Sequence, residues 1–254
     1  SRGEETPASQ ANAAELAGIA RAFDGLNHGV VQVVSDFDLL RGPQHFDAEF
    51  DLVEVLARAA RRPLSMTWLQ RDPGGEQWRA VRERVERGVA AGLPLYLQAA
   101  ARGIGVINGL DASFHPFMGF PGYQEVAQLP LAQRVQALRE PQRKARILAE
   151  KPLPLAGDGT PLPPLVDIML AMIERISARM FAWSSHDGDA PDYEPAVTAS
   201  FFVRAKQRGV SALEAIFDHL TQGDGTNLIY FPIFNYNDGN LDVVRSMLEH
   251  PRAL

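Results

Sequence analysis

The sequence predicts an α/β fold in which parallel strands alternate with helices. Three short runs rich in β-branched and aliphatic residues recur about every thirty residues, at 29–36, 63–70 and 93–100. A segment with a helical pattern separates each run from the next. Because parallel strands need a crossover of this length, the rhythm is typical of a parallel sheet or barrel.

The elements of this series follow one another through the first part of the chain. Asn12 with Glu15 three residues later predicts the start of a helix that continues to about Phe23. Apolar residues at helical spacing predict a second helix over 46–60. A charged helix is predicted over 77–91, with Arg84 expected to be exposed. Strands are predicted over 64–69 and from Leu93, and another apolar run covers 104–107.

From residue 111 the βα rhythm stops, so we expect a largely helical and loop insertion over 111–190. Long helical patterns cover 131–150 and 165–180. Ser211 with Glu214 predicts a capped helix through Leu220, and a strand is predicted over 228–234. Asn240 is expected to cap a last helix over 241–248. The predicted organisation is therefore 1–110 for the βα units, 111–190 for the insertion and 191–254 for a late βα unit.

Composition excludes several classes of protein. A net charge of −6 and a pI near 5.5 do not favour a nucleic-acid surface. The absence of cysteine removes disulfides, thiolate metal ligands and cysteine nucleophiles. No apolar run is long enough to span a bilayer, and no signal-peptide pattern is present. We therefore expect a cytoplasmic protein that acts on a small molecule, with neither nucleic acid nor membrane as a partner.

Candidate site residues follow the predicted strands. In parallel barrels chemistry occurs at the carboxyl ends of the strands, which selects Asp36, Gln70 and Arg102. Asp36 is either a side chain at a barrel mouth or a loop cap, and Gln70, next to Arg71, is open to the same two interpretations. Arg102 either binds a substrate carboxylate through its planar guanidinium or forms a surface salt bridge.

Two later segments add further candidates. His115 lies in an apolar loop, 115–121, which is either a lid over a pocket or packed core with a hydrogen-bonded histidine. Asn235 and Tyr236 follow a predicted strand and are either side chains of a barrel mouth or parts of a turn and helix cap. The six histidines show no paired ligand spacing, so no metal site is expected from this chain alone.

Four motifs stand out: LPLAQRV at 129–135, REP at 139–141, DYEP at 192–195 and NY-x-DGNLD-x-VR-x-ML-x-HP at 235–251. Together they resemble the second half of the N-acyl-D-amino-acid deacylases (D-aminoacylases) of the metal-dependent amidohydrolase superfamily. The resemblance runs over most of the chain, and the last motif is the most specific.

The resemblance implies a TIM barrel, of which this chain is a fragment that covers about strands five to seven. It implies a hydrolase that acts on a linear carbon–nitrogen amide bond, with N-acyl-D-amino acids as candidate substrates. It also implies zinc or another divalent metal in the complete protein, which polarises the amide and activates water. Val34 and Trp68 occupy positions where the family has metal-binding histidines, and we expect both to point into the barrel mouth or interior. The metal ligands are therefore expected mostly outside this chain, and no catalytic residue is assigned.

A second function is compatible with the same sequence. It is a catalytically silent, amidohydrolase-like barrel that binds a small acidic ligand or serves as a subunit. In both cases the other barrel strands would come from the missing N- and C-terminal parts of the barrel or from a partner chain, and a homo-oligomer is compatible with either. A His-x-His motif upstream and an Asp-containing Gly-rich motif downstream would favour the enzyme.

Overall fold

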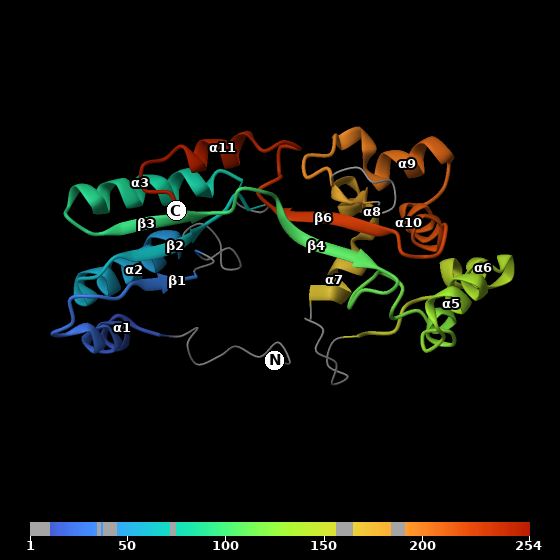
Figure 1. The fold of residues 1–254 in the computed structure, drawn as a ribbon, viewed down its shortest axis with the longest axis horizontal. Helices are drawn as coiled ribbons and strands as arrows, with labels where there is room; N and C mark the ends of the chain where they lie inside the picture. The colour runs from blue at the N-terminus through green and yellow to red at the C-terminus, as the bar shows by residue number, and fades with distance from the viewer. Residues whose placement is uncertain (1–10, 35–36, 38–44, 72–74, 156–164, 184–190) are drawn as a thin grey trace. The chain divides into compact units, whose positions relative to one another are not determined.

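The protein is a mixed α/β structure with a parallel sheet, as the sequence predicts. The computed structural model describes residues 11–34, 37, 45–71, 75–155, 165–183 and 191–254 (Figure 1). The chain divides into two compact units. We call the unit made by the residues up to 104 and by 233–254 the sheet unit, and the unit made by 105–232 the helical unit. The predicted three-part division has other bounds than these units and stays a prediction.

The sheet unit is a series of parallel strands joined by helices. Its elements are α1 (Ala13–Ala20), η2 (Arg21–Phe23), β1 (Val31–Val33), α2 (Phe46–Ala60), β2 (Leu64–Trp68), α3 (Gln77–Ala90), β3 (Leu95–Ala99) and α11 (Asp242–Leu248). The three strands lie in the order β1-β2-β3, and both pairs are parallel. The predicted helix over 46–60 is confirmed, and the others differ from prediction by a few residues at their ends.

The last residues of the chain extend this sheet beyond β3. The N–H of Leu97 donates to the carbonyl oxygen of Arg252 at 2.8 Å, and the N–H of Leu254 donates to the carbonyl oxygen of Leu97 at 2.7 Å. Ala253 forms a parallel bridge with Leu97. This segment is therefore a fourth parallel neighbour in the sheet, although the helical unit separates it from β3 along the chain.

One face of this sheet forms the core of the unit. Side chains alternate between the two faces of a strand, and Leu64, Met66 and Trp68 of β2 all point to the helical side. They pack with α2 through residues such as Phe50 and with α3 through residues such as Val85. The helices therefore cover this face, and the polar residues of the strands lie on the other.

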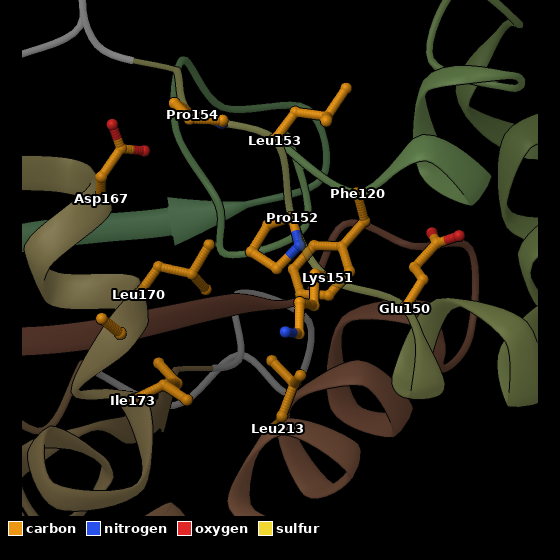
Figure 2. A pocket seen from close by; sticks show the side chains of 11 residues that line it. Phe120, Glu150, Lys151, Pro152, Leu153, Pro154, Asp167, Leu170, Ile173 and Leu213 are labelled. Carbon is orange, nitrogen blue, oxygen red and sulfur yellow. The ribbon is translucent and has the colours of Figure 1, made fainter.

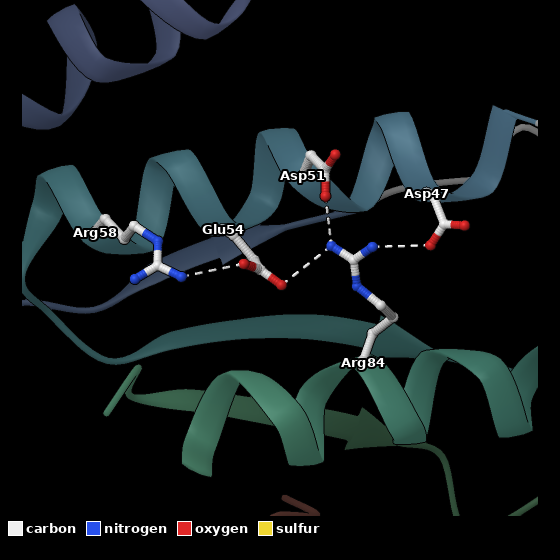
Figure 3. Close-up of polar contacts among 5 residues, drawn as sticks. All are labelled: Asp47, Asp51, Glu54, Arg58 and Arg84. Carbon is white, nitrogen blue, oxygen red and sulfur yellow. Dashed lines mark hydrogen bonds and ion pairs between the residues drawn. The ribbon is translucent and has the colours of Figure 1, made fainter. Parts of the chain in front are cut away.

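Arg84 is not the exposed residue that the sequence predicts, because it bridges α3 and α2 (Figure 3). Its guanidinium pairs with Asp47 at 2.8 Å, with Asp51 at 2.5 Å and with Glu54 at 3.1 Å. Its side chain is 11% exposed and lies over the ring of Phe50, 4.7 Å from the ring centre. Burial alone would lower the pKa of Arg84, but the hydrogen bonds that its guanidinium donates to the three carboxylates raise that pKa above its ordinary value.

The helical unit combines short helices with a second sheet. Its elements are β4 (Ile104–Gly109, of which Ile104 belongs to the sheet unit), α4 (Pro121–Gln124), α5 (Leu131–Leu138), α6 (Pro141–Ala149), α7 (Leu165–Ala171), α8 (Ile173–Ile176), η4 (Ser177–Arg179), β5 (Phe181–Trp183), η5 (Val197–Ala199), α9 (Phe201–Arg208), α10 (Ala212–Thr221) and β6 (Leu228–Phe234, whose last two residues belong to the sheet unit). The strands lie in the order β4-β6-β5. Gly105 lets β4 approach β6, because a Cβ there would lie 2.0 Å from the carbonyl oxygen of Phe231.

The arginines of two sequence motifs stabilise turns of the helical unit. Arg134 Nη1 donates to the carbonyl oxygen of Leu110 at 2.7 Å and to the hydroxyl of Tyr123 at 3.1 Å. Arg139 Nε donates to the carbonyl oxygen of Thr221 at 2.7 Å. Guanidinium groups that satisfy backbone carbonyls in this way hold loops to helices, so both residues have a structural role in this unit. None of the described helices is long and apolar enough to cross a membrane.

Candidate functional site at the carboxyl ends of the strands

Four of the six candidate residues belong to the sheet unit, two after its parallel strands and two after β6 of the other sheet. Gln70 follows β2, Arg102 follows β3, and Asn235 and Tyr236 follow β6. Asp36, which follows β1, lies outside the described residues. The carboxyl ends of the parallel strands meet at one edge of the sheet, and hydrogen bonds of Asn235 join the end of β6 to it, so this edge is the candidate site.

Asn235 connects three strand ends. Its N–H donates to the carbonyl oxygen of Gln70 at 2.9 Å, and its Oδ1 accepts from the N–H of Gln70 at 2.8 Å. Its Nδ2 donates to the carbonyl oxygens of Ala100 and Arg102, both at 3.5 Å. Its φ of 63° is left-handed, a conformation that asparagine adopts more readily than most residues. These contacts assign Asn235 a structural role at this edge.

The side chain of Gln70 is held by the loop that follows β6. Its Nε2 donates to Oδ2 of Asp238 at 2.8 Å, and its Oε1 accepts from the N–H of Asn237 at 3.3 Å. Gln70 is 2% exposed, and Tyr236 beside Asn235 is 1% exposed. The hydrogen bonds of Gln70 and Asn235 therefore stabilise turns and loops, which is the structural one of the two interpretations that the sequence left open.

Arg102 is the exposed cation at this edge of the sheet. Its Nη1 donates to the carbonyl oxygen of the adjacent Gly103 at 3.3 Å. Among the described residues no carboxylate pairs with its guanidinium, so the alternative of a surface salt bridge is not seen there. The neighbouring cation Arg71 is 6% exposed and has a partner. Among the described residues of this edge, Arg102 therefore offers an exposed guanidinium to which an anionic ligand can bind.

His115 belongs to the helical unit and is packed in its core. Its Nδ1 accepts from the N–H of Phe117 at 3.2 Å, and its ring meets Tyr123 edge-on with centres 4.5 Å apart. Burial lowers the pKa of His115 to about 3, and the positive charge of Arg134 acts in the same direction. The histidine is therefore neutral at physiological pH. That it joins Arg102 and Asn235 at one cavity stays a prediction.

The face of the sheet opposite the helices carries a polar row that the sequence reasoning missed. Gln32 Nε2 donates to Oε1 of Gln98 across the three strands at 2.8 Å. Ser65 and Tyr96 lie in register between β2 and β3, and the guanidinium of Arg252 lies 5.2 Å from the ring centre of Tyr96. In a barrel this face would be the interior. Period-two alternation along the strands was the signal that could have found these residues.

Trp68 does not point where we expected it. Its Nε1 donates to the carbonyl oxygen of Trp78 in α3 at 2.8 Å, and its ring also meets His250 edge-on. Trp68 is 1% exposed within the core between sheet and helices, so the prediction that it points into the barrel interior is wrong. Because neighbours alternate, Ser65 and Thr67 are the β2 residues on the opposite face of the sheet. Val34 is 80% exposed at the end of β1.

The described residues do not by themselves form a metal centre. They contain no group of three or more histidine, aspartate or glutamate side chains placed to hold an ion. Trp68, at a position where a ligand was sought, is an apolar core residue. No chemical step through a metal is therefore derived from these residues.

Comparisons with protein-family models, with curated proteins and with solved structures find no match for this chain.

Proposed function

We propose that the protein is an amidohydrolase-type hydrolase that cleaves a linear carbon–nitrogen amide bond, with N-acyl-D-amino acids as candidate substrates. The observation that carries the proposal is the order of the sheet unit. β1, β2 and β3 are parallel neighbours joined by α2 and α3, and the segment at Ala253, which follows α11 after the helical unit, is the next parallel neighbour of β3. Such an order is typical of part of a (β/α)8 barrel.

The chemistry of the candidate site supports the same proposal. An N-acyl amino acid carries a free carboxylate, and the guanidinium of Arg102 is exposed at the carboxyl edge without a carboxylate partner among the described residues. The polar row from Gln32 to Tyr96 supplies amide and hydroxyl groups on the face that would line a barrel interior. In this proposal the metal that activates water is held mostly by residues outside this chain.

The test is hydrolysis by the complete protein. It should release free amino acid from N-acetyl-D-methionine or a related substrate, faster than from the L-enantiomer. Removal of metal by a chelator should abolish the release, and zinc or another divalent ion should restore it. Metal analysis of the same sample should find at least one divalent ion per chain. A metal-free protein that hydrolyses neither enantiomer, before or after zinc addition, would refute the proposal.

The exposed guanidinium of Arg102 also supports a second candidate function. A catalytically silent barrel could use the same group to bind a small acidic ligand without turning it over. Equilibrium dialysis with a labelled N-acyl amino acid separates the two functions. Saturable binding that depends on Arg102, with the ligand recovered intact, would support the silent barrel, whereas recovery of free amino acid supports the enzyme.

A further inference from the structure

The helical unit contains an apolar cleft that the proposed function does not use (Figure 2). Its volume is about 470 Å³, within the range of roughly 300–1,000 Å³ that is usual for small-molecule sites. The segment 150–154 forms one wall and α7 with α8 forms the other, with Leu213 of α10 at the base. Leu170 and Ile173 supply the apolar surface of the helical wall.

The wall formed by 150–154 is fixed by backbone contacts. The N–H of Leu153 donates to the carbonyl oxygen of Gly119 at 2.7 Å, and the N–H of Leu155 donates to Oδ1 of Asp167 at 3.1 Å. Gly119 permits this approach, because a Cβ there would lie 2.6 Å from the carbonyl oxygen of Leu153. Pro152 and Pro154 restrict the backbone further. A wall that is already ordered loses little entropy when a ligand binds.

Lys151 is the cation of the cleft, which is also lined by the carboxylates of Glu150 and Asp167. Of the charged side chains that line it, Glu150 accepts from the N–H of Gly122 at 2.6 Å, and Asp167 is held by Leu155. Lys151 is exposed and has neither a hydrogen bond nor an ion pair with any described residue. In Figure 2 its side chain extends from the rim toward the space between Ile173 and Leu213. An apolar cleft with one unpaired ammonium group is complementary to an apolar chain that ends in an anion.

We propose that this cleft binds a linear medium-chain monocarboxylate, with its chain against Leu170, Ile173 and Leu213 and its carboxylate on Lys151. At roughly 30 Å³ per non-hydrogen atom, the cleft has room for about fifteen such atoms. Decanoate, with twelve, fits this space. The site lies wholly within the helical unit, so the proposal does not depend on the proposed hydrolase activity.

Binding of decanoate to the full chain tests the proposal, measured by isothermal titration calorimetry and by ligand-observed NMR below its micellar concentration. We expect saturable binding of one decanoate per chain. Lys151→Gln should raise the Kd for decanoate about tenfold, because the charge-assisted hydrogen bond between the ammonium group and the carboxylate is lost. Decanol, which lacks the anion, should bind the wild type and Lys151→Gln with equal affinity.

Matched variants keep the result interpretable. Lys206→Gln removes a lysine of the same unit that lies over the ring of Phe202 and outside the cleft, and it should leave decanoate binding unchanged. Ala171→Trp places a large ring at an exposed position of the cleft and should abolish the binding of decanoate and of decanol, with an unchanged circular dichroism spectrum. Absence of saturable binding, or equal decanoate affinity for wild type and Lys151→Gln, would overturn the proposal.

Discussion

Acid should destabilise the helical unit through His115. The native histidine is buried and its pKa is lowered to about 3, whereas an unfolded histidine titrates at 6.5. Between these values the unfolded state binds a proton that the native state does not, so stability is present above about pH 6.5 and is lost as the pH falls. Each pKa unit corresponds to about 1.4 kcal/mol. The free energy of unfolding is therefore lower by about 2 kcal/mol at pH 5 than at pH 7, and by about 4 kcal/mol at pH 3.

The assay is urea unfolding at pH 7 and at pH 5, followed by hydrogen exchange of peptides from 105–232. The comparison variant is His115→Asn, whose side-chain oxygen can still accept from the N–H of Phe117 but does not titrate in this range. The wild type should lose about 2 kcal/mol more between the two pH values than the variant does. His28, an exposed histidine, provides a control in His28→Asn, which should keep the wild-type loss. Equal losses for wild type and His115→Asn would refute the reasoning.

Three further variants test the structural interpretations. Arg84→Met should lower the free energy of unfolding by about 1–2 kcal/mol in a urea titration, because three carboxylates lose their shared partner, and the loss should be smaller at high salt. The control Arg58→Met removes an exposed helical ion pair and should lower the free energy of unfolding by less than about 0.5 kcal/mol. Asn235→Gly keeps the left-handed backbone but leaves the buried N–H of Gln70 without its acceptor, so thermal unfolding should show a loss of about 1–3 kcal/mol. Asn108→Leu should stabilise the helical unit by about 1 kcal/mol in denaturant titrations, because the Asn108 amide is buried without a partner among the described residues; a loss of stability would contradict this.

Local signals in the sequence predicted much of the fold. Asn12 and Ser211 cap their helices as expected, each accepting from the N–H three residues later, at 3.0 Å. The predicted strand over 228–234 is confirmed. The single helix expected over 131–150 is instead two, because Glu140, which precedes Pro141, has a non-helical ψ of 124° and Pro141 begins a new helix. The break at Met172 between α7 and α8 has no comparable sequence signal.

The candidate site was predicted less completely because a strand's end does not determine which face a side chain occupies. Gln70 and Asn235 were found by their position after strands, and the structure does bring them together, but as partners of each other. The prediction for Trp68 was wrong because Trp68 lies two residues after Met66 and four after Leu64, and side chains at this spacing point to the same, apolar face of the strand. Period-two alternation could have placed Gln32 and Gln98 on one face, but their contact joins residues far apart in the chain and follows only once the strand order is known.

The central claim is that the carboxyl edge of the parallel strands binds the carboxylate of an amide substrate through Arg102. The direct measurement is kcat/KM of the complete protein for one N-acyl-D-amino acid, for wild type, Arg102→Ala and Arg245→Ala. Arg245 is a matched control, since it is exposed on α11 and pairs only with Glu249 in the described part of the chain. We predict that Arg102→Ala loses about 2–4 kcal/mol of transition-state binding and that Arg245→Ala loses less than about 1 kcal/mol. An Arg102→Ala protein with the kcat/KM of the wild type would contradict the account.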